Sequence, residues 1–504
     1  MTTAPRTLNI AAIALIGAFC LQVLLAVPRL SATSDEPIHL AAGYSYWKTR
    51  DFRMNPEHPP LAKLFAAVPL LLIRPKLDTS NKSWAGGAEV PFSFKFLYEN
   101  DADRLLFWSR AVMIMVAALG AAITFLWARD MFGPAAGIFA LTLYAFCPNL
   151  LAHGMLVTTD VPVAAFGVLA LYLFWKRGEQ PSWLNDVATG LALGAAMAVK
   201  FSGALLPLVI AGFCLVRKQI KSLLIIAAAS LLVIEAAYLF SSSPLLYFWN
   251  MRFVNANHLK NYPFYMFGEF KPGGWWYYFL VAFAFKATLP TVVFVLVTVI
   301  EAVRGFINRW GEMILLVSIA VFLVATTIVA GQVGVRYILP VFPLVFIWVS
   351  RIVPKFLTAR SGTAVIVALL AWHAWSGISA FPNYIPYFNE MAGGPRGGPA
   401  LLDDSNVDWG QGVKQAAAYV RQRRLENVTI VFFNPFEGPG SEYYGLPKNV
   451  RDPDVVDRLL VHTPTPGTYI ISSHYVARMS HLNPAWKIYK PIDRIGESLW
   501  VYAF

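Results

Sequence analysis

Long apolar stretches, separated by short polar connections, occupy most of the chain as far as residue 380. A helix needs about 20 mostly apolar residues to cross a membrane, so stretches of this kind predict membrane-spanning helices. We predict about eleven spans, near residues 8–28, 105–127, 133–150, 157–175, 187–200, 203–216, 222–240, 276–301, 313–331, 337–350 and 362–380. The two stretches on either side of Lys200 can also be interpreted as one bent span.

Three long segments interrupt or follow this pattern and should lie outside the membrane. They cover residues 29–104, 241–275 and 381–504. The second is the shortest and is rich in Tyr, Phe, Trp and Asn. Within the first, Leu61–Ile73 is apolar but too short to span, so we expect a helix that lies along the membrane surface. Such a helix would flank an opening from the bilayer, which an enzyme with a lipid substrate needs.

The last segment has the pattern of a small folded domain. Its strand-like runs, 428–433 and 468–472, alternate with the helix-like runs 413–424 and 453–460. Alternating strands and helices predict a mixed α/β domain. The predicted fold is therefore an all-α, multi-span membrane domain over residues 1–380, followed by an α/β domain over residues 381–504.

Composition supports a membrane protein and gives its orientation. The chain is 57% hydrophobic and only 14% charged, whereas soluble domains carry about 25% charged residues. With the N-terminus in the cytoplasm, the short outer connections hold only Lys200 and Arg336 as basic residues. The inner side then collects Arg6, Arg129, Lys176, Arg177, Arg217, Lys218, Lys221, Arg304, Arg309, Arg351, Lys355 and Arg360. This positive-inside pattern accounts for the net charge of +12 without nucleic-acid binding. It predicts a cell (inner) membrane protein with an extracytoplasmic C-terminal domain.

Two adjacent carboxylates, Asp35 and Glu36, follow the first span, with His39 one helical turn further on. A carboxylate at the membrane–water boundary can act as general base on a hydroxyl group. The alternative is ordinary helix-start chemistry, in which Ser34 or Asp35 caps the helix and Glu36 lies in its first turn.

A second polar stretch, Asn55-Pro56-Glu57-His58-Pro59-Pro60, precedes the surface helix. Residues before proline adopt extended conformations, so Glu57 and His58 should point to opposite sides. One of them would then bind a divalent metal ion with a residue from elsewhere, and His258 and Glu269 are the candidates. The alternative is a polar turn without ligands.

Three further ionisable residues lie near the outer ends of spans: Asp160, Lys200 and Arg336, the last followed by Tyr337. Charged groups beside hydrocarbon are costly, and they usually either reach the interface or serve a function. Two outer cations beside outer carboxylates predict a site for an anionic headgroup. The acidic stretch at 403–411 could bind a cation or an acceptor, or it could cap the helix that follows.

Together these features resemble the lipid-carrier-dependent glycosyltransferases of the protein O-mannosyltransferase and aminoarabinose-transferase type, which share the GT-C membrane fold. The resemblance covers about residues 8–380, and similar phrases recur in the tail. The features that carry it are Asp35-Glu36, Glu57-His58-Pro59-Pro60, Thr159-Asp160, Lys200, Arg336-Tyr337-x-Leu339-Pro340, Gly273-Gly274-Trp275-Trp276-Tyr277-Tyr278 and Asp404-Ser405-Asn406-Val407-Asp408-Trp409-Gly410-Gln411.

The resemblance implies a hexosyl- or pentosyltransferase that moves a sugar from a polyprenyl phosphate to a hydroxyl of a protein, lipid or glycan, with inversion. Asp35, in the pair with Glu36, would be the catalytic base, and Lys200 and Arg336 would neutralise the departing phosphate. Asp160 and Tyr337 would also bind the carrier phosphate or substrate. Aminoarabinose transferases have a Glu-Lys pair at the turn, with the Glu on a metal and the Lys near phosphate. Here the pair is Glu57-His58, so His58, a residue that can be neutral, would take the place of that lysine in binding the carrier phosphate or substrate. Glu57 and His258 remain the metal candidates.

Two other classes also fit a polytopic chain. A secondary transporter or flippase would place its polar residues near the membrane midplane, often within repeated halves. In this sequence the candidates gather at the outer ends of spans, and no repeat is visible. A non-catalytic protein that binds the lipid carrier would share the outer site but would not turn over the donor.

Overall fold

The structure is a computed structural model that describes residues 6–241, 246–257, 262–434, 438–446, 458–459 and 464–504. Within these residues, six helices are long and apolar enough to cross a membrane, or up to eight if each of two bent pairs is one span. The six are α1 (Arg6–Ala26), α6 (Ala102–Phe132), α9 (Asp160–Glu179), α12 (Ile220–Ala237), α16 (Arg309–Val329) and α19 (Arg360–Ser379). Each of the predicted spans coincides with a helix or a bent pair, but several are shorter than a full crossing.

Prolines and breaks explain the shorter and bent elements. In the first bent pair α8 begins at Pro148, and in the second Pro290 is the second residue of α15. Proline is tolerated in the first helical turn and disrupts a helix interior, so it favours a new helix direction. The bent pairs are α7 (Pro134–Ala145) with α8 (Pro148–Gly154), at 63°, and α14 (Tyr278–Lys286) with α15 (Leu289–Ala302), at 119°. The shorter helices are α10 (Trp183–Val199), α11 (Leu206–Val216), α17 (Val341–Val349) and α18 (Val353–Phe356).

Helix α17 lies at the centre of the helical part. Every residue from Val341 to Val349 is buried, and the helix packs against α6, α7 and α16. A helix that is apolar on all sides belongs in the interior of a bundle. The segment just before it, a short 3-10 turn over Val335–Ile338, carries Arg336 and Tyr337. This fully buried helix therefore anchors one wall of the candidate site.

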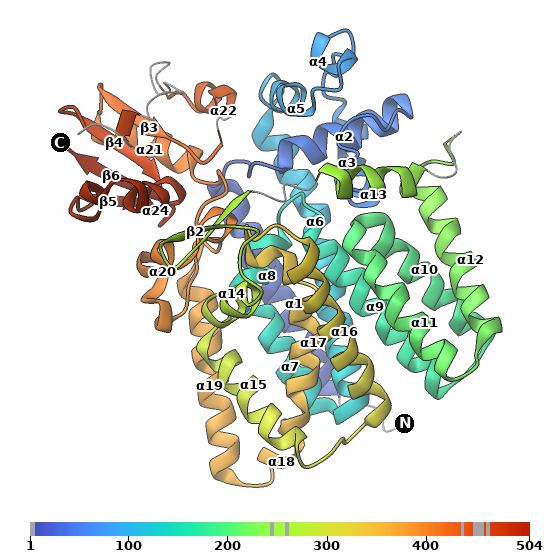
Figure 1. The fold of residues 1–504 in the computed structure, drawn as a ribbon. Coiled ribbons are helices and arrows are strands. Elements are labelled where there is room, and N and C mark those ends of the chain that lie inside the picture. Colours follow the sequence, from blue (N-terminus) through green and yellow to red (C-terminus); the bar gives the residue numbers. More distant parts are fainter. Residues whose placement is uncertain (1–5, 242–245, 258–261, 435–437, 447–457, 460–463) are drawn as a thin grey trace.

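The segment between α1 and α6 folds into four helices at one end of the bundle: α2 (Glu36–Thr49), α3 (Leu61–Ile73), α4 (Lys82–Ala85) and α5 (Glu89–Tyr98). Helix α3 begins and ends where the sequence predicts. It crosses α2 so closely that a Cβ on Gly43 would lie 2.1 Å from the Lys63 carbonyl oxygen. Helix α13 (Leu246–Asn257) and a hairpin of β1 (Pro263–Met266) and β2 (Glu269–Pro272) lie at the same end (Figure 1).

The tail forms the expected α/β unit with a four-stranded sheet in the order β3-β4-β6-β5. Strands β3 and β4 are parallel, whereas β6 runs antiparallel to both of its neighbours. The strands and helices are β3 (Val428–Val431), β4 (Thr468–Ser472), β5 (Asp493–Ile495), β6 (Leu499–Ala503), α21 (Val413–Arg423), α22 (Gly438–Tyr443) and α24 (Ser473–Leu482). The predicted helix at 453–460 lies almost entirely outside the described residues.

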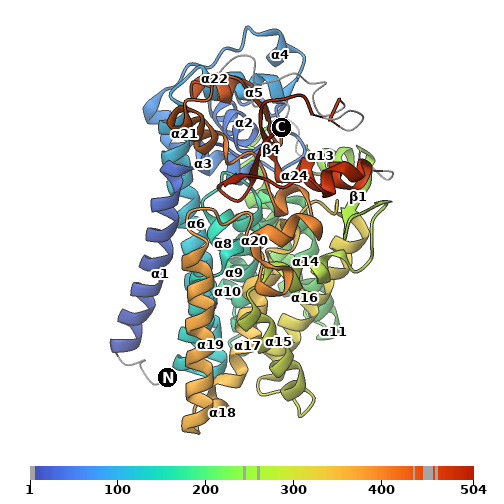
Figure 2. The ribbon, with the colours of Figure 1, turned by 90° about the vertical axis from the view of Figure 1, so that its left-hand side faces the viewer.

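The segment between α19 and α21 belongs to the helical core. Its apolar residues Tyr384, Phe388 and Trp409 pack in the main cluster of the membrane helices, whereas the apolar cluster of the sheet begins at Val413. In Figure 2 this segment runs between the top of the helices and the sheet. The N-terminal end lies at the opposite end of the helices from the α/β unit (Figure 1).

Candidate active site

Asp35 precedes α2 but does not cap it. Its side chain accepts no hydrogen bond from the first turn of the helix. Instead, Oδ2 accepts a hydrogen bond of 2.9 Å from Arg336 Nη1, and 28% of the side chain is exposed. The helix-cap interpretation of Asp35 is therefore wrong for its side chain, which points to a cation 301 positions away in the sequence.

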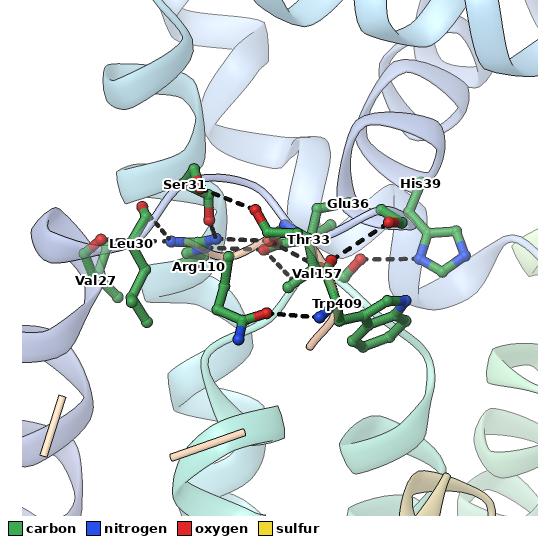
Figure 3. Close-up of polar contacts among 12 residues, drawn as sticks. Val27, Leu30, Ser31, Thr33, Glu36, His39, Arg110, Val157 and Trp409 are labelled. Carbon is green, nitrogen blue, oxygen red and sulfur yellow. Dashed lines mark hydrogen bonds and ion pairs between the residues drawn. The ribbon is translucent and has the colours of Figure 1, made fainter. Parts of the chain in front are cut away.

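Glu36 occupies the opposite environment, a fully buried polar network (Figure 3). Arg110 donates from Nε to Oε1 at 2.8 Å and from Nη2 to Oε2 at 2.6 Å. The backbone N–H groups of Thr33 and Val157 donate to the same carboxylate at 2.8 and 3.0 Å. Although burial opposes ionisation, Arg110 and these N–H groups hold the pKa of Glu36 below its ordinary value.

The Glu36 network fixes the loop that carries Asp35. Arg110 also donates to the carbonyl oxygen of Ser31 at 2.7 Å, and the Ser34 N–H donates to the Trp409 carbonyl at 2.9 Å. Both carboxylate oxygens of Glu36 are fully engaged with protein donors. In this arrangement the Glu36 carboxylate holds the loop of Asp35 in place, and the catalytic role predicted for the Asp35-Glu36 pair stays a prediction.

Replacement of Arg110 by Met should lower the free energy of unfolding by about 3–5 kcal/mol, because it leaves Glu36 buried without its cation. Unfolding by SDS in mixed micelles, followed by tryptophan fluorescence, measures this loss. Arg104→Gln is the matched control, since Arg104 is an exposed residue less than two turns away on the same helix. Equal stability of Arg110→Met and the control would contradict a structural role for the ion pair.

Asp160, Lys200 and Arg336 form one cluster with Asp35. Lys200 Nζ donates to Asp160 Oδ1, and Arg336 Nη1 lies 3.7 Å from Asp160 Oδ2. Asp160 is the first residue of α9, and Lys200 follows α10 in an extended conformation. The ends of three separate elements therefore bring together residues that the sequence singled out independently.

Aromatic rings hold both cations in place. Lys200 Nζ lies 4.8 Å from the centroid of the Tyr337 ring. Arg336 Cζ lies 5.1 Å from the same ring and 4.2 Å from the ring of Trp409. Stacking on aromatic faces orients a guanidinium without consuming its N–H donors. Arg336 Nε is buried and has no hydrogen-bond partner among the described residues, so the cluster retains a donor for an anionic ligand.

His58 lies beside this cluster, and its ring is 5.3 Å from that of His39. Burial, together with the nearby His39, Lys200 and Lys63, keeps the pKa of His58 well below its ordinary value. The ring is therefore neutral at neutral pH. A neutral His58 can donate or accept a hydrogen bond, but it does not replace the positive charge of a lysine at this turn.

Lys63 is a functional neighbour that the sequence analysis missed. Its Nζ donates to the carbonyl oxygens of His58 and Asn55 at 2.7 and 2.8 Å. Burial lowers the pKa of Lys63 to about 7. The side chain therefore fixes the turn that carries Glu57 and His58. A lysine inside an otherwise apolar thirteen-residue helix was the signal available in the sequence.

The described residues contain no set of side chains that matches the predicted metal site. They contain no group of three or more His, Cys, Asp or Glu side chains that could hold a metal ion. Glu57 is exposed, Glu269 is an exposed residue of β2, and His258 lies outside the described residues. A metal site at Glu57 and His258 therefore stays a prediction.

The acidic stretch at 403–411 joins the α/β unit to the site rather than capping α21, whose N-cap is Gly412. Asp403 pairs with Arg478 of α24 at 2.8 Å, and Asp408 accepts a hydrogen bond of 2.5 Å from Ser472 at the end of β4. Asp404 is half-buried, and its carboxyl interacts electrostatically with Arg336. Burial raises the pKa of Asp404 above its ordinary value.

Comparisons with known proteins agree with the sequence-based resemblance. Residues 103–248 match the family model described as dolichyl-phosphate-mannose-protein mannosyltransferase. No curated protein matches the chain in sequence.

Solved structures match over nearly the whole chain. ArnT from Cupriavidus metallidurans in the apo state aligns with a TM-score of 0.50 and 16% identity, over 97% of each chain. The same protein bound to undecaprenyl phosphate aligns with a TM-score of 0.49 and 15% identity, over the same shares. The oligosaccharyltransferase AglB from Archaeoglobus fulgidus, in complex with an inhibitory peptide and a dolichol phosphate, gives 0.47 and 12% identity, over 95% of this chain and 72% of AglB.

The match to apo ArnT confirms the predicted class of fold, a GT-C membrane domain with a small α/β unit. The fold and the family match together indicate a multi-span membrane glycosyltransferase. The chain is similar to the mannosyltransferase family in its second to seventh predicted spans and to ArnT in its architecture.

Proposed function

We propose that this protein transfers a sugar from a polyprenyl-phosphate carrier to a hydroxyl acceptor at the outer face of the membrane, with inversion at the anomeric carbon. The observation that carries the proposal is the ion pair between the part-exposed Asp35 carboxylate and Arg336, inside a cluster completed by Lys200. A base and two phosphate-binding cations thereby lie within one small site.

The reaction is a single displacement. Asp35 accepts the proton of the acceptor hydroxyl while its oxygen attacks the anomeric carbon. The bond between that carbon and the phosphate oxygen breaks, and its electron pair stays on the phosphate. Lys200 and Arg336 stabilise the charge that develops there, and preorganised electrostatics of this kind are usually the largest catalytic contribution.

The Asp35–Arg336 pair suggests how donor binding prepares the base. A lipid phosphate that binds Arg336 competes with Asp35 for the same guanidinium. Transfer of Arg336 from the carboxylate to the phosphate would leave Asp35 free to accept a proton. The rings of Tyr337 and Trp409 keep the guanidinium within the site during this exchange.

The outer location is supported by the positive-inside pattern and by the position of the site. The site lies at the end of the helices that carries the α/β unit, and the N-terminal end lies at the other (Figure 1). Short basic connections mark the cytoplasmic side of a membrane protein.

The test of function is release of free polyprenyl phosphate in liposomes that hold the purified protein, a polyprenyl-phosphate sugar and acceptor-bearing membrane extract. Lys200→Gln should slow release about 10- to 100-fold, since a hydrogen bond to a charged group contributes about 1.5–3 kcal/mol. Lys48→Gln, a change of an exposed lysine on α2, is the control and should release carrier at the normal rate. Absence of carrier release with every donor, while the labelled lipid changes leaflets, would favour a flippase.

A further inference from the structure

A cavity lies between α11 and α16, away from the candidate active site. Its volume is about 560 Å³, within the range of about 300–1,000 Å³ that is typical of small-molecule pockets. The wall is apolar along most of its length, with Leu208, Gly212, Phe213, Val216, Met313 and Val317 among the lining residues. The shape and lining suit a hydrocarbon chain.

The polar end of this cavity lies at the membrane boundary opposite the active site. Arg217 follows the last residue of α11, and Arg309 is the first residue of α16; both line the cavity. Helix α16 then runs 21 residues, about 30 Å, to the end of the bundle that carries Arg336. Figure 1 shows α11 and α16 in the lower, helical part of the molecule.

The two arginines carry charge that the protein does not neutralise. Arg217 stacks on the Trp310 ring at 3.5 Å, but neither Arg217 nor Arg309 forms an ion pair within the described part of the chain. Two acidic side chains at this end already have partners: Glu312 pairs with Arg351 at 2.5 Å, and Asp186 with Arg177 at 2.7 Å. Two exposed cations therefore border an apolar cavity at the level of lipid headgroups.

We propose that this cavity binds an anionic phospholipid, with one acyl chain between α11 and α16 and the phosphate between Arg217 and Arg309. Basic pockets between membrane helices are suited to anionic headgroups, and each arginine near an anionic surface contributes about 1 kcal/mol. The bound chain would lie along the apolar wall between the two helices, which contact each other through Phe213 and Trp310 beside the arginines. This site is separate from the one that binds the sugar donor, and it does not depend on the proposed reaction.

The experiment uses the full-length protein in nanodiscs and measures retained lipid by mass spectrometry after extensive detergent exchange. Phosphatidylglycerol and phosphatidylcholine with identical acyl chains are the probes. Wild-type protein should retain phosphatidylglycerol about 10- to 30-fold better than phosphatidylcholine. The double variant Arg217→Gln/Arg309→Gln should lose this preference, whereas Arg360→Gln, an exposed change at the same end, should keep it.

A second variant tests the apolar part without changing charge. A Cβ at Gly212 meets nothing within 4 Å, so Gly212→Leu fills the cavity without a clash and should abolish retention of either lipid. Gly17→Leu, equally free of neighbours on α1, is its control. Unchanged retention in Arg217→Gln/Arg309→Gln or in Gly212→Leu would overturn the proposal. Displacement of phosphatidylglycerol by polyprenyl phosphate at equal concentration would also overturn it, since the cavity would then hold the carrier.

Discussion

Asp35→Asn should reduce the rate of sugar transfer by about 10²–10⁴-fold, the range that a general base contributes. The amide keeps the size of the side chain and can still meet Arg336, but it cannot accept the proton of the acceptor hydroxyl. Binding of the donor should persist, because in the proposed reaction the phosphate contacts Lys200 and Arg336 rather than Asp35. The expected signature is therefore a fall in kcat with little change in the KM for the lipid donor.

The measurement is the initial rate of transfer in liposomes at saturating donor, together with retention of labelled donor by the same protein. Asp51→Asn is the matched control, since Asp51 lies in the same outer loop and pairs with Arg53 at 2.6 Å, away from the site. Normal transfer by Asp35→Asn would refute Asp35 as the base. Loss of both transfer and donor binding would instead assign Asp35 to the phosphate-binding cluster.

Charged residues at the ends of apolar stretches were the part of the site that the sequence could reveal. Asp160, Lys200 and Arg336 each stand beside a span, where an ionisable group is costly and therefore conspicuous. The direction of the chain through the membrane puts these residues at one end of the bundle. Because the end of the helix bundle has a limited area, residues that lie there come into contact with one another.

Buried partners gave no comparable signal. Arg110 lies in the first third of the long apolar helix α6, and its partner Glu36 is 74 positions away in the sequence. Nothing local distinguishes such an arginine from one that reaches the interface. The different environments of Asp35 and Glu36 gave no signal either. Asp35 is part-exposed and Glu36 is fully buried because of which side of α2 faces α6, and two adjacent carboxylates in a sequence do not reveal this.

Only part of the structure of the tail could be predicted from the sequence. Strands β3 and β4 are apolar runs and were predicted, whereas β6 was not predicted, and β5 begins with Asp493-Arg494 and has only three residues. The contact of Trp409 with Arg336 joins segments 73 positions apart through packing of the connecting segment on the helices. The short acidic run at 403–411 was visible in the sequence, but its role as a joint between two units was not.

Arg336→Lys should lower kcat about 10²–10³-fold, the loss expected when one preorganised donor to a developing negative charge is removed. The variant keeps a positive charge but loses the planar guanidinium group with its several N–H donors. Arg336 reaches Asp35 at 2.9 Å and Asp160 at 3.7 Å while it stacks between two rings. A lysine ammonium is a point charge on a flexible stem and cannot satisfy these contacts together.

Steady-state transfer rates for the wild type, Arg336→Lys and the control Arg53→Lys test this expectation. Arg53 is a suitable control because it also pairs with an aspartate and lies 5.4 Å from an aromatic ring, that of Trp84, yet it stands outside the cluster. Thermal unfolding of each variant separates a catalytic loss from a folding defect. Full activity of Arg336→Lys would mean that charge alone stabilises the departing phosphate. The aromatic stacking and the exchange of Arg336 between Asp35 and the donor would then have no part in the rate.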